Sequence, residues 1–419
     1  MMKSRRELPR EANARLRTLR LTGRHAFALA ALLLAACNTA APAAAPTPTT
    51  AAASDEFVFG VVLVGPQDDH GWSEAHHAGG RYVEARLPGS RMLVLDSLNP
   101  DARPTMTLEQ GVDAMVQVNS KLVFITSDDF AADTLLVAEK YPDTIFVHIS
   151  GDQALTGEAP ANLGNLMGRM EYGKMIAGCA AALTTQTGAV AYVGPLVNHE
   201  TQRLANSAYL GARYCYEHLR GEDPDELSFQ IQFIGFWFHI PDVTLDPAVV
   251  SNELLDSGAD VILSGIDTTE ALAVASERAA AGEAVWAIPY DYEGACTSGP
   301  EVCLGVPYFN WGPGYLELAR EVYEGAWTQR WEWDGPDWAD LNNHESSAVG
   351  FLKGPALTAD HAEQLDEFIA GLADGSIMLF TGPLNYQDGS VFLAEGETAT
   401  DEQVWYTEQL LQGTETLGE

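Results

Sequence analysis

Aromatic and acidic side chains recur directly after the apolar segments of this sequence. The first group is Asp69, Trp72 and Ser73, which follows the apolar run 57–64. Later apolar runs are followed by Asp129 and Phe130, Trp237 and Phe238, Asp267, Asp291, and Trp311. Aromatic faces stack on planar rings at about 1–3 kcal/mol each, and carboxylates accept hydrogen bonds from N–H and O–H donors. These groups predict a pocket for a planar heterocycle, or for a sugar, which they also suit.

Each of these residues also has a purely structural explanation. Asp69 and Asp267 precede predicted helices and could serve as N-caps, and an aromatic residue after a strand often packs in a core. Recurrence at successive strand ends favours a shared binding site over these separate explanations. The sequence lacks the Gly-x-Ser-x-Gly, Walker A and His-Glu-x-x-His motifs, so we expect a binding protein without cofactor or metal, and not an enzyme.

Short apolar runs alternate with longer amphipathic runs from residue 56 onward, which is typical of parallel sheets covered by helices. Ligands of such sheets bind beyond the carboxyl ends of the strands, where the recognition residues stand. Two successive sets of this pattern predict an α/β fold with two doubly wound lobes joined by several crossovers. We expect lobe one at 56–165 plus about 292–330, lobe two at 166–291 plus about 331–380, and a C-terminal hairpin and tail at 381–419.

The N-terminal segment differs in charge from the rest of the chain. The whole chain has a formal net charge of −36, which argues against nucleic-acid binding. A basic stretch and the short apolar run 26–36 precede Cys37, and Leu34-Ala35-Ala36-Cys37 resembles a bacterial lipobox. We therefore predict a lipoprotein signal peptide at 1–37, lipidation of Cys37, a flexible tether at 38–55, and anchoring on the extracytoplasmic side of the cell membrane.

Four further cysteines lie in the chain. Cys296 and Cys303 could close a small disulfide loop in an oxidising compartment. Cys179 and Cys215 fall in predicted helices, and the sequence leaves open whether they pair or remain buried thiols.

Several short motifs follow one another in a recognisable order between about Phe57 and Gly413. They include Asp68-Asp69-His70-Gly71-Trp72-Ser73, Asn162-x-Gly-x-x-x-Gly168-Arg169 at the expected start of a long helix, Asn198-x-Glu200-x-x-Arg203, Phe236-Trp237-Phe238, and Asn310-Trp311-Gly312-Pro313. Their order resembles the basic membrane protein family of ABC-transporter substrate-binding lipoproteins, whose characterised members bind purine nucleosides or nucleobases. The resemblance implies the type I periplasmic-binding-protein fold, with three crossovers and hinge closure around the ligand.

The resemblance also implies roles for individual residues. Trp72 matches the aromatic residue that stacks on the base from lobe one, and Trp237 or Phe238 matches its counterpart from lobe two. Asp69 and Asp291 match carboxylates that bind ribose. Nucleoside-binding members carry a Lys near Asn310-Trp311-Gly312, whereas no Lys or Arg lies between residues 306 and 319 here. This departure favours a purine base over a nucleoside.

The partners implied by the resemblance are a small purine ligand and the permease and ATPase subunits of an ABC importer, with the chain itself a monomer. Two alternatives remain open from the sequence. One is a protein that binds a sugar or another polar metabolite, and the other is a ligand-binding sensor lipoprotein that signals to a membrane receptor.

Overall fold

The computed structural model describes residues 56–418, so the predicted signal peptide, tether and Cys37 lie outside the described residues. The first lobe contains a parallel six-stranded sheet in the order β11-β5-β4-β3-β1-β2. Its strands are β1 (Phe57–Val62), β2 (Ser90–Leu95), β3 (Leu122–Ile125), β4 (Ile145–Ile149), β5 (Leu163–Gly168) and β11 (Trp331–Asp334). Most of these strands are buried on both faces, as expected for parallel strands covered by helices.

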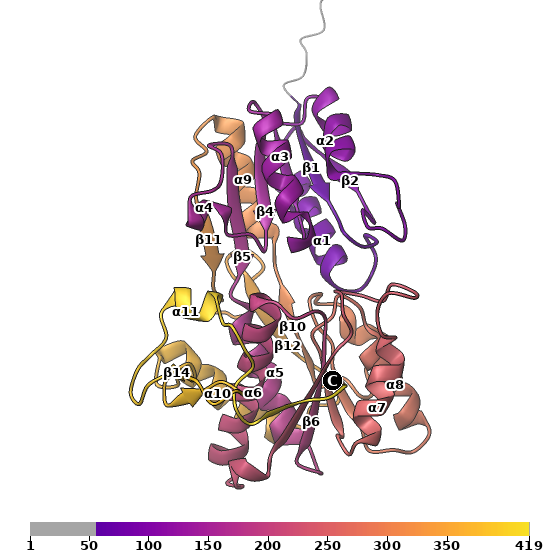
Figure 1. Cartoon of the computed structure of the whole chain (residues 1–419), viewed down its shortest axis with the longest axis vertical. Coiled ribbons are helices and arrows are strands. Elements are labelled where there is room, and N and C mark those ends of the chain that lie inside the picture. Colours follow the sequence, from indigo (N-terminus) through magenta and orange to yellow (C-terminus); the bar gives the residue numbers. More distant parts are fainter. Residues whose placement is uncertain (1–55, 419) are drawn as a thin grey trace, which may run out of the picture. The chain divides into compact units, whose positions relative to one another are not determined.

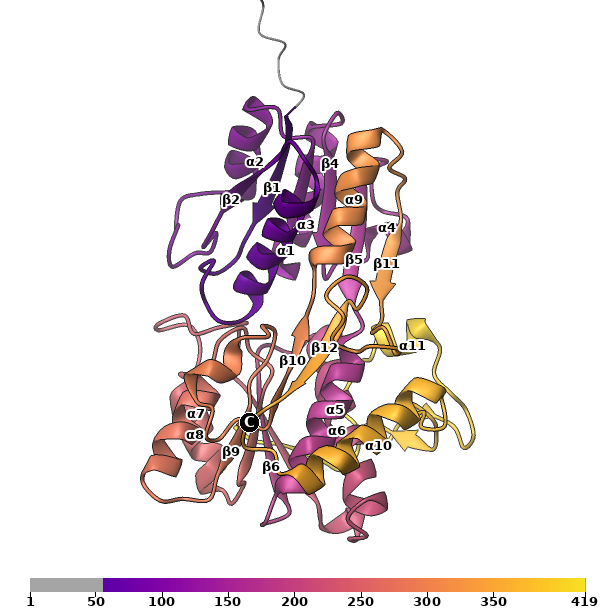
Figure 2. The same cartoon turned by 180° about the vertical axis from the view of Figure 1, so that it is seen from behind.

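Helices cover both faces of the first sheet. On one face α1 (Trp72–Arg86) packs beside α9 (Gly312–Glu324), and on the other α2 (Leu108–Gln117) packs beside α3 (Ala131–Lys140) (Figures 1 and 2). The short α4 (Gln153–Thr156) follows β4. The position of α1 matters for the site, because its first residue, Trp72, comes after the carboxyl end of β1.

The second lobe contains a parallel five-stranded sheet in the order β15-β7-β6-β8-β9. Its strands are β6 (Ala189–Gly194), β7 (Ser228–Phe233), β8 (Val261–Ser264), β9 (Trp286–Ile288) and β15 (Thr414–Thr416). Its main helices are α5 (Met170–Thr184), α6 (His199–His218), α7 (Pro247–Asp256), α8 (Glu270–Ala280) and α10 (Ala359–Asp374). The described residues therefore form an α/β fold with two parallel sheets, which agrees with the predicted fold class.

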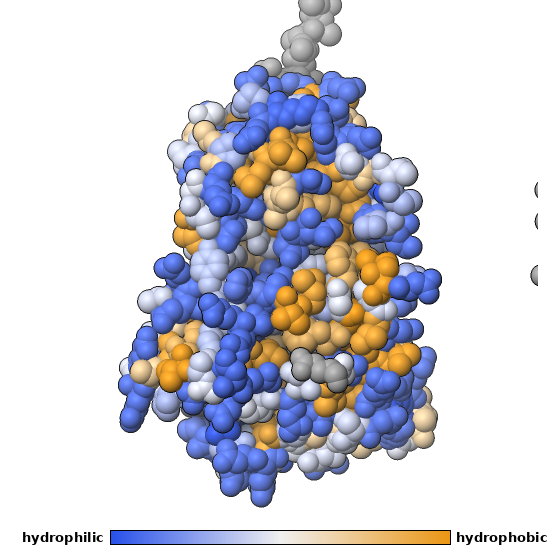
Figure 3. Space-filling model, viewed as in Figure 1, coloured by the Kyte–Doolittle hydropathy of each residue, from blue (hydrophilic) through white to orange (hydrophobic). Residues whose placement is uncertain are grey.

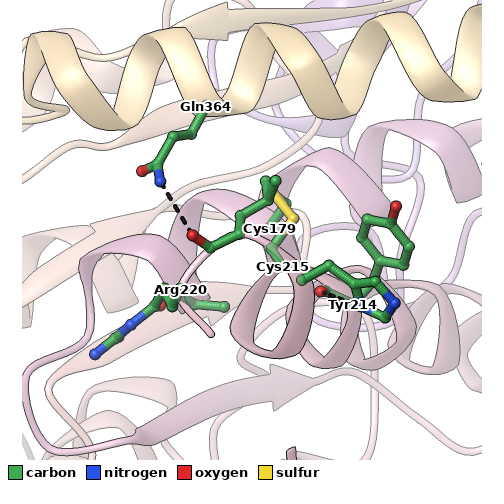
Figure 4. The surroundings of a disulfide bond; sticks show 8 residues. Cys179, Tyr214, Cys215, Arg220 and Gln364 are labelled. Carbon is green, nitrogen blue, oxygen red and sulfur yellow. Dashed lines mark hydrogen bonds between the residues drawn. A yellow bond between two sulfur atoms is a disulfide. The ribbon is translucent and has the colours of Figure 1, made fainter. Parts of the chain in front are cut away.

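Helices α5 and α6 lie unusually close together. A Cβ on Gly178 would stand 1.9 Å from the carbonyl oxygen of Ala208, so only glycine permits this approach. A disulfide between Cys179 and Cys215 joins the two helices in the core of the lobe, and Gln364 of α10 donates a hydrogen bond to the Leu219 carbonyl beside it (Figure 4). A second disulfide joins Cys296 and Cys303.

Within residues 56–418 the chain passes between the lobes at three places. The first passage lies between β5 and α5. The other two are β10 (Gly305–Phe309) and β12 (Val349–Lys353), which pair antiparallel and run between the two sheets (Figure 2). The C-terminal segment then adds the hairpin β13 (Leu384–Asn385) and β14 (Val391–Leu393), the short α11 (Asp401–Trp405), and β15. No helix among residues 56–418 combines the length and apolar character that crossing a membrane requires.

The structure differs from the sequence analysis in three local respects. Residues 163–168 form β5 and the helix begins at Met170, because residues 163–166 pair with β4 and residues 165–168 pair with β11 instead of starting a helix. Strand β11 pairs with β5 and so belongs to the first sheet, not to the second lobe, in which we expected residues 331–380. We expected the chain to cross from lobe two to lobe one near residue 292. It crosses later, because Cys303 still forms a β-bridge with Ala287 of β9 in the second lobe.

Hydrophilic residues cover much of the face shown in Figure 3, with smaller apolar patches on both lobes. The exposed large apolar side chains include Leu136 of α3 and Val249 of α7. Phe59, Phe124 and Tyr315 belong to the core of the first lobe. The second lobe has two main apolar clusters, one with Tyr192 and Phe229 and one with Val193 and Ile262.

Candidate functional site

A cavity lies between the two sheets and is lined by residues of both lobes. Lobe one contributes Trp72, Ser127, Asp128 and Ser150, and lobe two contributes Glu200, Trp237, Asp267 and Tyr290. Each of these residues follows the carboxyl end of a strand or lies in the first turn of the next helix.

The two tryptophans that line the cavity use their N–H groups within the protein. Trp72 donates from Nε1 to the Thr126 carbonyl oxygen over 2.6 Å, and Trp237 donates from Nε1 to Asp128 Oδ1 over 2.7 Å. Both side chains are buried, with 6% and 8% of their surface exposed. The indole faces, and not the indole N–H groups, are therefore what these residues can offer to a ligand.

The two lobes meet directly at the edge of the cavity. Asp128 of lobe one accepts hydrogen bonds from Trp237 and from Asn198 Nδ2, the latter over 3.0 Å. Asn198 also caps α6 by accepting from the Thr201 amide, which fixes the helix that carries Glu200. At Gly71 a Cβ would stand 1.7 Å from the Asp267 carbonyl oxygen. Glycine at this position thus permits a close approach of the lobes, and the structure is a closed form.

Carboxyl groups dominate the electrostatics of the cavity. Asp128, Glu200 and Asp267 line it, and Asp291 is fully buried without a hydrogen-bond partner for either carboxylate oxygen among the described residues. Burial raises the pKa of Glu200 to about 7 and raises the pKa of Asp128. Burial, and then the neighbouring carboxylates, raise the pKa of Asp267 well above its ordinary value. The cavity is rich in hydrogen-bond acceptors and in groups that favour the protonated state.

Lys174 of α5 is a buried cation close to this group of carboxyls. Its Nζ donates to the Ser264 carbonyl oxygen over 2.6 Å and stands 3.2 Å from the centre of the Tyr290 ring. Burial lowers the pKa of Lys174 to about 7, although the charge of Asp291 opposes this change. Lys174 therefore supports one face of Tyr290, whose side chain lines the cavity.

The structure brings three of the predicted ligand-binding residues, Trp72, Trp237 and Asp267, to the cavity wall. Asp69 instead accepts hydrogen bonds from the backbone amides of Gly71, Ser73 and Glu74 at the start of α1. Its neighbour Ser73 accepts from the Gly65 amide over 3.0 Å. These two residues hold the turn that carries Trp72, which accounts for their position outside the cavity lining.

The remaining predicted residues also lie outside the cavity lining. Phe130 packs in the core of lobe one, and Asp129 beside it is exposed, while Asp128 takes the position at the cavity. Phe238 packs edge-on against Phe236. Trp311 stacks on His76 and Phe309 with ring centroids 4.4 and 4.7 Å apart, and it meets Trp72 edge-on at 5.6 Å. Trp311 therefore supports Trp72 from behind, and Asp291 lies beneath the cavity wall.

Sequence analysis missed five residues that line the cavity: Ser127, Asp128, Ser150, Glu200 and Tyr290. Three of them could have been found from the sequence, because Asp128 and Tyr290 are direct neighbours of predicted residues and Glu200 lies in one of the quoted motifs. Which residue of such a turn faces the ligand depends on where the strand ends, and that is uncertain by one residue in a sequence. Within residues 56–418 no group of three His, Cys, Asp or Glu side chains is arranged to hold a metal ion.

Two parallel sheets with a cavity between their carboxyl ends define a binding protein of the periplasmic type, and comparison with known families agrees. Residues 57–330 match the Bmp family model, described as "ABC transporter substrate-binding protein PnrA-like". The chain belongs to this family of ABC-transporter substrate-binding proteins. Its members are binding proteins and not enzymes, and the resemblance stated from the motifs is confirmed.

The chain is also similar to individual proteins. A purine-binding protein of Brucella abortus is 27% identical over 353 residues, which cover 84% of this chain and 90% of that protein. A putative ABC transporter glucose-binding protein of Haloferax volcanii is 27% identical over 274 residues, covering 65% and 63%. Among solved structures, an ABC-transporter solute-binding protein of Aeropyrum pernix superposes with a TM-score of 0.62 at 15% identity, covering 84% of this chain and 96% of that one. This structural match supports the type I periplasmic-binding-protein fold.

Proposed function

We propose that this substrate-binding protein captures a purine nucleobase in the cavity between its lobes. One observation carries the proposal: the indole rings of Trp72 and Trp237, from opposite lobes, line the same small cavity. Two flat apolar faces with carboxyl groups around them suit a planar ring that has N–H donors at its edge. The similarity to the purine-binding protein of Brucella abortus supports the same class of ligand.

A free base fits the proposal better than a nucleoside or a nucleotide. The lining residues include three carboxyl groups and no Lys or Arg, so a phosphate group would meet only like charge. The absence of a cationic side chain between residues 306 and 319 supports the same choice.

The proposed mechanism of capture is closure of the two lobes around the ring. In the closed form Asp128 joins Trp237 across the cavity edge, and Gly71 meets the Asp267 backbone. These contacts between lobes must break when the cleft opens, and a bound ring would add its own contacts to the closed form only. Ligand binding would then shift the population toward the closed form, which an ABC permease recognises.

The location proposed for the protein is the extracytoplasmic face of the cell membrane, with Cys37 as the lipidated residue. The motif Leu34-Ala35-Ala36-Cys37 supports this proposal. Replacing Cys37 with Ala should release the protein from the membrane fraction, whereas unchanged membrane association would contradict lipidation at this site. The permease and ATPase subunits of an importer are the expected partners, and loss of purine uptake on deletion of the gene would separate transport from sensing.

A sugar is the second candidate ligand, because the similar protein of Haloferax volcanii is a putative glucose-binding protein. Aromatic and acidic residues also suit a sugar. Calorimetry on ligand-stripped protein with adenine, adenosine and glucose distinguishes the candidates. We expect adenine to bind with the highest affinity and glucose to give no heat. Binding of glucose without binding of any purine would overturn the proposal.

A further inference from the structure

The carboxyl group of Asp267 lines the cavity without a hydrogen-bond partner among the described residues. The residue is 4% exposed and lines the cavity, and no described residue donates a hydrogen bond to its side chain. Its backbone is held in place, because its amide donates to the Trp237 carbonyl over 2.9 Å and its carbonyl lies against Gly71. A buried polar side chain without a partner implies that a ligand supplies the missing hydrogen bonds.

The groups that face Asp267 are mainly acidic. The acids that act on its charge are Asp291 after β9, Asp69 at the start of α1, Asp128 after β3 and Glu200 on α6. Tyr290 after β9 interacts with Asp267 as well, whereas Lys174 on α5 and Tyr192 on β6 interact with Asp291. Lys174 acts on the charge of Asp291, and its Nζ already donates to the Ser264 carbonyl oxygen. An ionised Asp267 would therefore be repelled by these carboxylates in a closed site that excludes bulk water.

A neutral carboxyl group has a different recognition chemistry from a carboxylate. The carboxylate only accepts hydrogen bonds, whereas the neutral acid donates one through its O–H and accepts through its C=O. Burial together with the neighbouring acids raises the pKa of Asp267 well above its ordinary value, which favours the neutral form in the closed cavity. In an open cleft the same group would be hydrated and closer to its ordinary ionised state.

We propose, on the basis of the proposed purine function, that Asp267 reads the ligand edge as a neutral carboxylic acid. Its O–H donates to a ring nitrogen while its C=O accepts from the adjacent amino group. The site thus selects a heterocycle with a donor beside an acceptor, such as the amino-azine edge of adenine. Closure around such a ligand takes up one proton from solvent. This proton lies between the Asp267 oxygen and the ring nitrogen. No other bond forms or breaks.

Proton linkage gives the proposal a direct test with adenine as the probe. Calorimetry on the full protein between pH 6 and 8.5, in buffers of different ionisation enthalpy, counts the protons taken up. We expect an uptake of about one proton, and an affinity that falls about tenfold per pH unit where the free protein is ionised and the complex is protonated. Binding of adenine without proton uptake would overturn this proposal and leave the purine function intact. If adenine does not bind at any pH, both fail.

Two substitutions at Asp267 sharpen the test. Asn carries one donor and one acceptor like the neutral acid, so Asp267→Asn should keep the affinity for adenine within about tenfold and abolish its pH dependence. Asp267→Leu removes both groups and should reduce the affinity at least a hundredfold, with an unchanged circular dichroism spectrum as the folding control. Loss of binding in Asp267→Asn with a native spectrum would show that the ionised form is required, and would overturn the proposal.

Glu200 is the other lining carboxyl whose pKa is raised to about 7, so it could carry the proton instead. The variant Glu200→Gln separates the two locations. We expect the pH dependence of adenine binding to persist in Glu200→Gln and to vanish in Asp267→Asn. The reverse pattern would place the proton on Glu200 and overturn the assignment to Asp267. An adenine analogue with carbon in place of the paired ring nitrogen should lose both affinity and proton uptake.

Discussion

The indole Nε1 of Trp237 lies 2.7 Å from Asp128 Oδ1 and donates a hydrogen bond to it across the boundary between the two lobes. This contact ties a residue after β7 of one sheet to a residue after β3 of the other. Trp237 lines the cavity, so the contact also holds one of the lining side chains in place. One hydrogen bond thus contributes both to closure and to the shape of the proposed binding site.

Breaking this contact should weaken ligand binding through closure. We expect Asp128→Ala to lower the affinity for adenine about ten- to a hundredfold, because hydrogen bonds to charged groups contribute about 1.5–3 kcal/mol. Asp128→Asn keeps an acceptor for Trp237 and should lose less. Calorimetry gives the affinities, and small-angle scattering reports the fraction of closed protein. Equal affinities for wild type and Asp128→Ala would contradict a role for this contact.

Trp72 provides the proposed stacking face of lobe one. Trp72→Ala should lower the affinity for adenine more than about tenfold, the effect of one lost stacking contact. Trp72→Phe keeps an aromatic face and should retain most of the affinity. Tyr323→Ala, on the exposed side of α9, is the control away from the cavity, since Tyr323 is 50% exposed. Similar affinities for Trp72→Ala and this control would exclude stacking on Trp72.

The stability of the ligand-free protein should depend on pH through Glu200. Burial raises the pKa of Glu200 from 4.5 to about 7, so its contribution to stability is present below about pH 4.5 and is lost as the pH rises to about 7. Glu200→Gln removes this dependence. Relative to wild type, the variant should therefore gain melting temperature at pH 8 and show little gain at pH 5. The difference in melting temperature between variant and wild type removes the contributions of the other titrating groups. The same gain at both pH values would contradict a raised pKa.

The disulfide between Cys179 and Cys215 should contribute to stability but not to ligand affinity. Its cysteines are 36 residues apart in sequence, and closure of a loop of that length stabilises by about 4 kcal/mol in the chain-entropy model. Replacing both cysteines with Ala should lower the melting temperature by several degrees. Cys296 and Cys303 are only 7 residues apart, so the corresponding double variant should lose less. A larger loss for the short loop would show that packing, not loop closure, dominates.

Much of the fold could be predicted because its signals are local. Buried parallel strands such as β1, β3 and β8 are short apolar runs, and helices such as α3 and α10 have clear amphipathic patterns. Strands β5 and β11 could not be predicted in this way. Residues 163–168 contain two glycines and an asparagine, and Trp331 joins the first sheet only through pairing with Asn165, far away in sequence.

Only part of the cavity lining could be predicted from the sequence. Trp72 and Trp237 follow buried strands, and both line the cavity. Asp128 could not be chosen over Asp129 from the sequence, because the short turn of 3₁₀ helix after β3 decides which of the two faces the cavity. Trp311 carried the right residue type at a strand end, yet its ring is used to support Trp72 through packing between α1 and α9.

A crystal structure of the protein with adenine tests the central claim most directly. The account predicts one purine ring between the indole faces of Trp72 and Trp237, with its edge within hydrogen-bond distance of the Asp267 carboxyl group. Adenine bound elsewhere, or a ring in the cavity that touches only one of the two tryptophans, would contradict it.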